Sequence, residues 1–360
     1  MAAPRDDVLA ELRDALPADR ILTDTDVMTS YLHDEAEWAD YGRARAVVRP
    51  LETAEVAATV AVCARHRVPV VPRGAGTGLS GGANAVEGGI VLTTERMRRI
   101  VEIDAAERLA VVQPGVVNDV LRAAVAEHAL WYPPDPASAP WSTIGGNVAT
   151  NAGGLCCVKY GVTRDYVLAL EVVTASGEVV RLGRRTAKGV AGYDLVGLMV
   201  GSEGTLGVIT EVTVRLRPAR PAASRTVVGF FDTLAACGAA VAGVTARGLQ
   251  PAEFELIDRH CLRAVNEWKH AGFPDDAAAL LLARTDLPEP AGGQEAEAIL
   301  AEFEAAGARE AVVSTDPMSG TSQWRSSELT LTTSAAPSIS CTPRRTSTGL
   351  PISIGRQLGS

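Results

Sequence analysis

Glycine is concentrated in three stretches of this 360-residue chain, and each stretch can present backbone amides to a ligand. The first, PRGAGTGLSGG at residues 72–82, follows the apolar run VPVV. Its five glycines in eleven residues allow positive φ angles and let successive N–H groups point at one anion. A pyrophosphate is the ligand that such a loop predicts, and a flexible surface loop is the alternative.

This first loop does not match two common nucleotide-binding motifs. Leu79 stands where a Rossmann fingerprint needs its third glycine. No glycine of the loop is followed by Lys and then Ser or Thr, as a Walker A loop requires. The sequence therefore supports neither a Rossmann site nor hydrolysis of a nucleoside triphosphate.

The second stretch, STIGGNVATNAGG at residues 142–154, places short polar side chains among its glycines. Hydroxyl and amide groups beside exposed N–H groups suit a ligand that forms many short hydrogen bonds. The ribityl chain, phosphate or isoalloxazine edge of a flavin is such a ligand. A turn-rich connection is an equal alternative.

The third stretch, residues 186–212, has glycines spaced three apart from Gly201 to Gly207, just before an expected strand. In that strand Ile209 can lay its backbone against a flat ring, and Glu203 either faces the ring or caps a turn. Taken alone, this stretch is better explained as a β-bulge that follows a helix C-cap.

The composition limits the partners and the compartment. The chain is 47% hydrophobic and 21% charged, which is typical of a globular protein with room for two domains. Its net charge of -9 argues against nucleic acid as a partner. Six cysteines without a C-x-x-C pair indicate buried thiols in a reducing compartment. No apolar run reaches the roughly 18 residues of a transmembrane helix, and the first residues lack a secretory signal, so we expect a cytoplasmic protein.

Strand and helix patterns position the three stretches. Thr53 is the expected N-cap of a helix, and Ala175 to Gly177 are expected to turn a hairpin. The segment PARPAAS is an expected linker, and the residues after it are less rich in glycine, which indicates a second unit. In this unit we expect a strand at FELID. We expect further strands at 46–50, 68–73, 90–93, 100–103, 109–113 and 206–218, and helices at 53–65, 118–129, 234–246 and 294–306.

In this order and at these separations, the three stretches resemble the FAD-binding domain of the vanillyl-alcohol-oxidase superfamily. The segments GAGTGLSGG and GSEGTLGVITEV resemble in particular the branch of FAD-linked glycolate oxidase subunits, D-lactate dehydrogenases and D-2-hydroxyglutarate dehydrogenases. The resemblance implies an α+β fold with a two-subdomain FAD-binding domain and an incomplete α+β cap domain. The expected divisions are an N-terminal helical segment (1–42), the FAD-binding domain (43–219), the partial substrate or cap domain (220–316) and a disordered or aberrant Ser/Thr-rich tail (317–360).

The resemblance also implies which residues contact FAD. Residues 73–79 would enclose the pyrophosphate, and Gly204 and Ile209 would approach the flavin. No histidine lies in these loops, so the implied FAD is non-covalent. The implied FAD contacts are Arg73, Gly74, Ala75, Gly76, Thr77, Gly78, Leu79, Pro134, Asp135, Thr143, Gly145, Gly146, Thr150, Asn151, Gly153, Gly204 and Ile209.

Members of this family oxidise a D-2-hydroxy acid to the 2-oxo acid by hydride transfer to flavin N5. Their base, and in several members a metal site, come from a C-terminal half with a His-Gly-Asp-Gly-Asn-x-His stretch. This chain has no histidine after His270, so we assign neither a catalytic residue nor a metal ligand. We expect a shifted reading frame or a truncated gene near residues 316–325, with a diverged terminus as the alternative. Arg344 and Arg345 are more readily a chance pair than a carboxylate clamp.

The expected function is therefore FAD-dependent oxidation of a small D-2-hydroxy acid such as D-lactate, glycolate or 2-hydroxyglutarate. The alternative is a module that binds FAD but lacks the C-terminal substrate and metal site. A third interpretation is a nicotinamide-dependent reductase of peptidoglycan precursor synthesis, which fits the amino-acid sequences of the loops less well. The expected partners are the hydroxy acid and an unidentified electron acceptor. An oligomer and peripheral binding at the inner face of the membrane are both left open.

Overall fold

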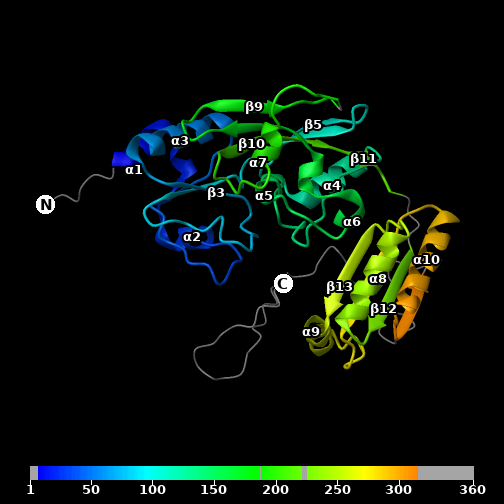
Figure 1. Cartoon of the computed structure of the whole chain (residues 1–360). Helices are drawn as coiled ribbons and strands as arrows, with labels where there is room; N and C mark the ends of the chain where they lie inside the picture. Colours follow the sequence, from blue (N-terminus) through cyan, green and yellow to red (C-terminus); the bar gives the residue numbers. More distant parts are fainter. Residues whose placement is uncertain (1–6, 187, 221–224, 315–360) are drawn as a thin grey trace, which may run out of the picture.

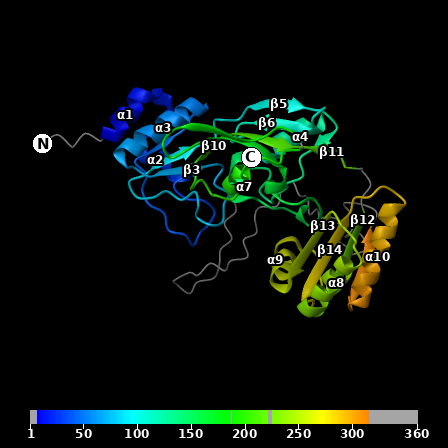
Figure 2. The same ribbon diagram turned by 45° about the horizontal axis from the view of Figure 1, so that its top comes forward.

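A computed structural model describes residues 7–186, 188–220 and 225–314. Residues 225–314 form one unit, which lies beside a larger unit that holds the three glycine stretches (Figures 1 and 2). The mixture of helices and sheets confirms the expected α+β fold. The Ser/Thr-rich tail, with the expected frame shift and the Arg344–Arg345 pair, lies outside the described residues.

The first sheet of the larger unit has the strand order β1-β2-β4-β3. Strands β2, β4 and β3 are parallel, and β1 is antiparallel to β2. Every side chain of β2 and β4 is buried, which explains why these strands read as continuous apolar runs and not as alternating ones. The strands are β1 (Ile21–Leu22), β2 (Ala46–Val48), β4 (Ile90–Thr93) and β3 (Val70–Arg73).

Two helices, α1 (Asp7–Ala15) and α3 (Thr53–His66), pack together over this sheet, and their apolar side chains share one core with β2 and β4. The expectation that Thr53 caps α3 is wrong. Glu52 occupies the N-cap position, and the Thr53 hydroxyl donates instead to Glu171 Oε1 at 2.7 Å.

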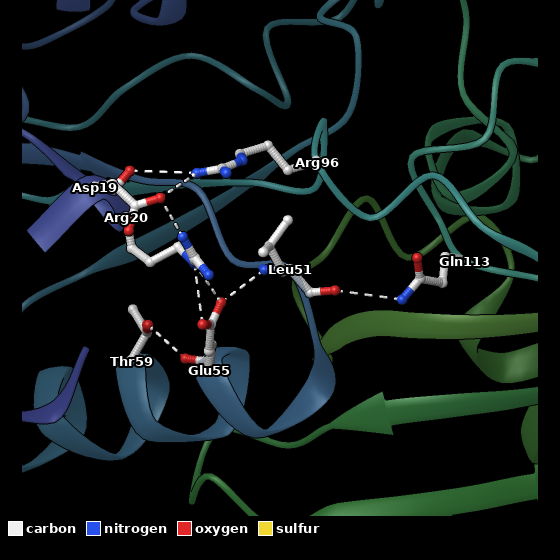
Figure 3. A network of polar contacts seen from close by, with 7 residues as sticks. All are labelled: Asp19, Arg20, Leu51, Glu55, Thr59, Arg96 and Gln113. Carbon is white, nitrogen blue, oxygen red and sulfur yellow. Dashed lines mark hydrogen bonds and ion pairs between the residues drawn. The ribbon is translucent and has the colours of Figure 1, made fainter. Parts of the chain in front are cut away.

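A polar network fixes the start of α3 against the preceding chain (Figure 3). The Arg20 guanidinium donates to both carboxylate oxygens of Glu55 at 3.0 Å. The Leu51 N–H donates to Glu55 Oε2 at 2.6 Å, and the Leu51 carbonyl accepts from Gln113 at 3.3 Å. The network thus joins the N-terminal segment, α3 and the end of the next sheet.

The second sheet is antiparallel, with the order β5-β6-β10-β8-β9. Gly177 turns the expected hairpin between β8 and β9 with φ +86°, a conformation that favours glycine. Helix α4 (Asn118–Ala126) and the sheet enclose the main core of this unit. The strands are β5 (Ile100–Asp104), β6 (Leu109–Val112), β10 (Val208–Arg215), β8 (Val167–Val173) and β9 (Val179–Gly183).

Glu171 links this sheet to α3. Its carboxylate accepts from Thr53, from Thr210 at 3.1 Å and from Arg181 at 3.0 Å. Burial alone would raise the pKa of the Glu171 carboxyl, but these three donors lower it by more, so the pKa lies below its usual value. A lowered carboxyl pKa stabilises the fold above the unfolded-state pKa, and this stability is lost as the pH falls through the folded-state value.

We therefore expect Glu171→Gln to lower the free energy of unfolding by about 1–2 kcal/mol at neutral pH. The difference from the wild type should shrink as the pH falls through the lowered pKa of Glu171, where its carboxylate becomes protonated. Urea unfolding at pH 7 and at acid pH measures both values. The matched control is Glu102→Gln in β5, whose exposed pair with Arg185 should contribute less than about 1 kcal/mol. An equal loss at both pH values would contradict the assigned role of the Glu171 charge.

The smaller unit is a four-stranded antiparallel sheet in the order β13-β14-β12-β15. Helices α8 (Leu234–Ala246) and α10 (Ala291–Ala305) share a core with one face of the sheet, and α9 (Arg259–Lys269) packs on the other. The sequence predicted α8, α10 and β13 but not α9 or the other three strands. The strands are β13 (Glu253–Asp258), β14 (Ala279–Thr285), β12 (Arg225–Phe231) and β15 (Glu310–Ser314).

Short helix α6 (Cys157–Tyr160) connects the two units. Lys159 and Tyr160 both bond to the buried carboxylate of Asp286, which follows β14. The Arg220 guanidinium stacks on Trp131 with 4.1 Å to the ring centroid. The remaining short elements are α2 (Thr25–Met28), α5 (Ile144–Thr150), α7 (Leu195–Met199), β7 (Leu130–Trp131), β11 (Arg217–Pro218) and 3-10 turns at Ala18–Arg20, Thr29–Tyr31 and Thr163–Tyr166.

Two further sequence expectations can be compared with the described residues. The cysteines among the described residues are free thiols, and burial raises the pKa of Cys63 to about 11. None of their helices combines the length and the apolar character that crossing a bilayer requires.

Candidate functional site

A cavity of about 520 Å³ lies where the three glycine stretches meet. The first stretch follows β3, the second contains α5, and the third leads into β10. All of the expected FAD contacts line this cavity except Pro134 and Asp135. The folding of the larger unit therefore brings together three segments, of which the first and the third are separated by more than a hundred residues in sequence.

Pro134 and Asp135 lie behind the second stretch and do not line the cavity. The Pro134 carbonyl accepts from the Asn118 side chain at 3.1 Å, and the Asp135 carboxylate accepts from the Cys156 N–H at 3.2 Å. A Cβ atom on Gly154 would lie only 2.2 Å from the Asp135 carbonyl oxygen. These contacts hold the backbone of the second stretch in place from behind.

Absent side chains allow the three stretches to touch. A Cβ atom on Gly74 would lie 2.7 Å from Thr143 Oγ1, so the first and second stretches could not pack as they do. A Cβ atom on Gly204, whose φ is +75°, would lie 2.9 Å from Pro72 Cγ, where the third stretch meets the first. The glycines thus serve close backbone approach as well as turning.

Arg73 supplies a positive charge directly beneath the first loop. Its guanidinium is buried and donates to the carbonyl of His33 at 2.8 Å and to that of Ser30 at 3.3 Å. Burial lowers the pKa of Arg73, although nearby acids, Asp34 foremost, oppose this effect. A Cβ atom on Gly76 would lie 2.0 Å from Arg73 Nη2, so the cation is packed against the back of the loop.

The second stretch carries polar groups that have no partner within the described residues. Asn147 Nδ2 and Ser142 Oγ are buried, line the cavity and make no hydrogen bond. Buried polar groups are normally paired, so these atoms point to a ligand that accepts from the amide and bonds the hydroxyl. Together with the glycine amides, they fit the phosphates and sugar oxygens of a dinucleotide such as FAD.

The third stretch closes the other side of the cavity. Glu203 adopts φ +50° and accepts from the Ser80 hydroxyl at 3.0 Å, so it ties the third stretch to the first. Ile209 lies in β10, beside a register shift in the pairing with β8. The register shift marks a β-bulge or an irregular pairing at the cavity wall, at the end of the stretch for which the sequence favoured a β-bulge.

Several cavity residues were not predicted as ligand contacts. Ser142 and Asn147 lie inside the second stretch, so its polar composition was a usable signal for them. Asp34 and Pro114 lie outside the glycine stretches, and no local pattern singles them out. Glu203, for which the sequence left open a position facing the ring, also lines the cavity. The additional lining residues are Asp34, Pro72, Ser80, Gly82, Ala83, Thr94, Pro114, Ser138, Ser142, Asn147, Ala149, Ala152, Gly207 and Val208.

Comparison with known families agrees with this geometry. Residues 44–183 match the FAD binding domain family, and residues 220–344 match the C-terminal domain of the FAD linked oxidases. The second match extends beyond the described residues, into the Ser/Thr-rich tail that begins at residue 317. The chain therefore belongs to the FAD-linked oxidases and has an FAD-binding domain.

Curated proteins with similar sequences include three kinds of oxidase or dehydrogenase. The chain is 46% identical over 244 residues to the glycolate oxidase subunit GlcD of Bacillus subtilis, covering 68% of this chain and 52% of that protein. It is 41% identical over 242 residues to a D-lactate dehydrogenase of Anaerostipes hadrus, covering 67% and 50%. It is 35% identical over 287 residues to a D-2-hydroxyglutarate dehydrogenase of Stutzerimonas stutzeri, covering 79% and 57%. The chain spans about half the length of these relatives.

Solved structures share the fold. An alkyldihydroxyacetonephosphate synthase superposes with a TM-score of 0.73 at 20% identity, covering 88% of this chain and 61% of that one. A p-cresol methylhydroxylase superposes with a TM-score of 0.72 at 17% identity, covering 88% and 68%. At such low identity these likenesses establish the fold alone.

Proposed function

We propose that this chain binds FAD non-covalently and uses it to oxidise a small D-2-hydroxy acid to the 2-oxo acid. The observation that carries the proposal is the convergence of three glycine stretches on one cavity. Two of them present unpaired polar groups or closely packed amides there. The names of the relatives support glycolate, D-lactate or D-2-hydroxyglutarate as the kind of substrate.

The residues of the cavity have distinct parts in this proposal. The backbone amides of residues 73–79 and of Gly145 and Gly146 bind the diphosphate, with the Arg73 charge behind the loop. Asn147 Nδ2 donates to an oxygen of the cofactor, and the backbone at Ile209 lies along the flavin ring. When bound, FAD supplies the hydride acceptor for the oxidation.

We also propose a division of labour along the chain. Residues 43–219 hold FAD, and residues 220–316 contribute to a cap over the substrate. Lys159 and Tyr160, through Asp286, set the position of the cap relative to the second glycine stretch. The physiological electron acceptor is a separate partner.

Non-covalent attachment rests on the cavity lining, which contains no histidine among the residues that the structure describes. Denaturing the loaded protein in acid should release all of the flavin into the supernatant. Flavin that stays with the precipitated protein would contradict non-covalent binding.

The activity is tested by anaerobic titration of the FAD-loaded protein with D-lactate, glycolate and D-2-hydroxyglutarate, with L-lactate as the control. The proposal predicts that one of the three acids bleaches the visible absorption of the oxidised flavin and yields the 2-oxo acid. A yellow protein that dithionite reduces but no hydroxy acid does would instead support an FAD-binding module without a substrate site.

A further inference from the structure

The N-terminal segment at residues 30–42 forms the outer wall of the first glycine loop, although the FAD binding domain match begins only at residue 44. The Glu35 N–H donates to the Gly78 carbonyl at 2.9 Å. The Asp34 N–H donates to Asn84 Oδ1 at 2.7 Å. These bonds tie the segment to the middle of the loop and to a residue just after it.

Asp34 has the unusual position in this wall. It is only 4% exposed and lines the cavity. Its Oδ1 accepts from the Ala36 N–H at 2.9 Å, in a local turn. Its Oδ2 is buried without a hydrogen-bond partner in the described chain, and it lies 3.2 Å from where a Cβ atom on Gly78 would stand. A buried carboxylate oxygen with no donor is unfavourable unless a ligand supplies one.

The nearby cation does not satisfy this oxygen. Arg73 interacts with Asp34 through the field of its charge, but its hydrogen bonds go to the carbonyls of His33 and Ser30. The charge of Asp34 is thus balanced in part, while its Oδ2 still lacks a donor. The missing donor has to come from the contents of the cavity.

The chemistry of FAD restricts which group that donor can be. Phosphate oxygens accept hydrogen bonds and repel a carboxylate, so the diphosphate itself is excluded as the partner. The donors next to the diphosphate are the hydroxyls of the ribose on one side and of the ribityl chain on the other. Both carry O–H groups of the same kind.

We propose that Asp34 Oδ2 accepts a hydrogen bond from a sugar hydroxyl of FAD, and that the segment at residues 30–42 is part of the cofactor site. This inference rests on the proposed binding of FAD. It adds an acidic contact, from outside the matched domain, to a site otherwise built from amides and a buried arginine.

The test compares wild type with Asp34→Asn, which keeps the acceptor for the Ala36 amide and replaces Oδ2. Titration of the apoprotein, followed by flavin fluorescence, should give an FAD dissociation constant about tenfold to a hundredfold higher. The thermal midpoint of the apoprotein should change little, because the loss of the attraction to Arg73 is offset by removal of a buried carboxylate oxygen that has no donor. The control, Glu37→Gln, makes the same charge change at an exposed position of the segment and should alter neither value.

A second variant, Asp34→Ser, retains an oxygen for the turn and lacks the second one, so it should reproduce the loss if Asp34→Asn folds poorly. Parallel titrations with ADP and FMN separate the two hydroxyl sources. Weaker ADP binding assigns the ribose, and weaker FMN binding with unchanged ADP binding assigns the ribityl chain.

Unchanged FAD affinity in both variants would overturn the inference and leave FAD binding intact. If both variants instead lose apoprotein stability in proportion to their loss of FAD affinity, the proposed hydrogen bond to FAD is overturned. Asp34 would then have a purely structural role. Wild-type protein that binds no FAD would overturn the proposed function itself.

Discussion

Replacing Gly76 with alanine is expected to weaken FAD binding by more than about a hundredfold. Gly76 has φ +80°, which strains a residue with a Cβ atom, and the new atom would lie 2.0 Å from Arg73 Nη2. Arg73 can move aside only by giving up its bonds to the carbonyls of His33 and Ser30, at about 1–3 kcal/mol for each buried group. Either response displaces the loop amides that we assign to the diphosphate. Flavin fluorescence titration measures the loss.

The matched control for this variant is Gly192→Ala. Gly192 has φ +87°, close to that of Gly76, but no atom lies within 4 Å of its Cβ position, and it does not line the cavity. It therefore carries the same backbone strain without the crowding. FAD binding should be unchanged in Gly192→Ala. A Gly76→Ala protein that binds FAD as tightly as this control would show that the first loop does not hold the diphosphate.

Replacing Phe303 with alanine is expected to lower the free energy of unfolding of the smaller unit by about 3–5 kcal/mol. Phe303, on α10, is fully buried and packs edge-on to Phe231, with 5.9 Å between ring centroids. It also stacks on Phe254 at 6.3 Å, and a Cβ atom on Gly229 would lie 2.8 Å from its ring. Because the site is filled on all of these sides, the shortened side chain leaves a cavity. Thermal and urea unfolding of the FAD-loaded protein measure the loss.

The conservative variant Phe303→Leu should be less destabilised, because more of the buried volume remains filled. Neither variant should lose FAD under native conditions, because Phe303 lies outside the larger unit. Equal stability of Phe303→Ala and wild type would contradict the packing described for α10. Release of FAD from Phe303→Leu would instead show that the smaller unit supports the cofactor site.

The larger unit was predictable from the sequence because its signals are local. The hairpin between β8 and β9 combines alternating apolar residues with a glycine turn, and β3 leads directly into a loop that only glycine could form. The smaller unit was harder because β12 and β14 are almost continuously apolar, as in RTVVGFF and ALLLART. Such runs do not distinguish a buried strand from a buried helix. The cap of α3 was mistaken because the Thr53 hydroxyl bonds to Glu171, 118 residues away.

In the candidate site, too, the local signals were predictable from the sequence and the long-range contacts were not. Nearly all of the FAD contacts expected from glycine spacing and the family resemblance line the cavity. The resemblance also implied FAD contacts at Pro134 and Asp135, which lie behind the second stretch and do not line the cavity, and no signal in the sequence singled out Asp34. The role of Asp34 depends on how the N-terminal segment folds back against the first loop, and one acidic residue in a polar segment carries no trace of that contact.

The most direct test of the central claim is the flavin content of the purified protein, measured by visible absorption after incubation with excess FAD and removal of the unbound cofactor. The account predicts a yellow protein with one FAD for each chain, released intact on denaturation. Protein that stays colourless after incubation with FAD, although circular dichroism shows it to be folded, would contradict the account.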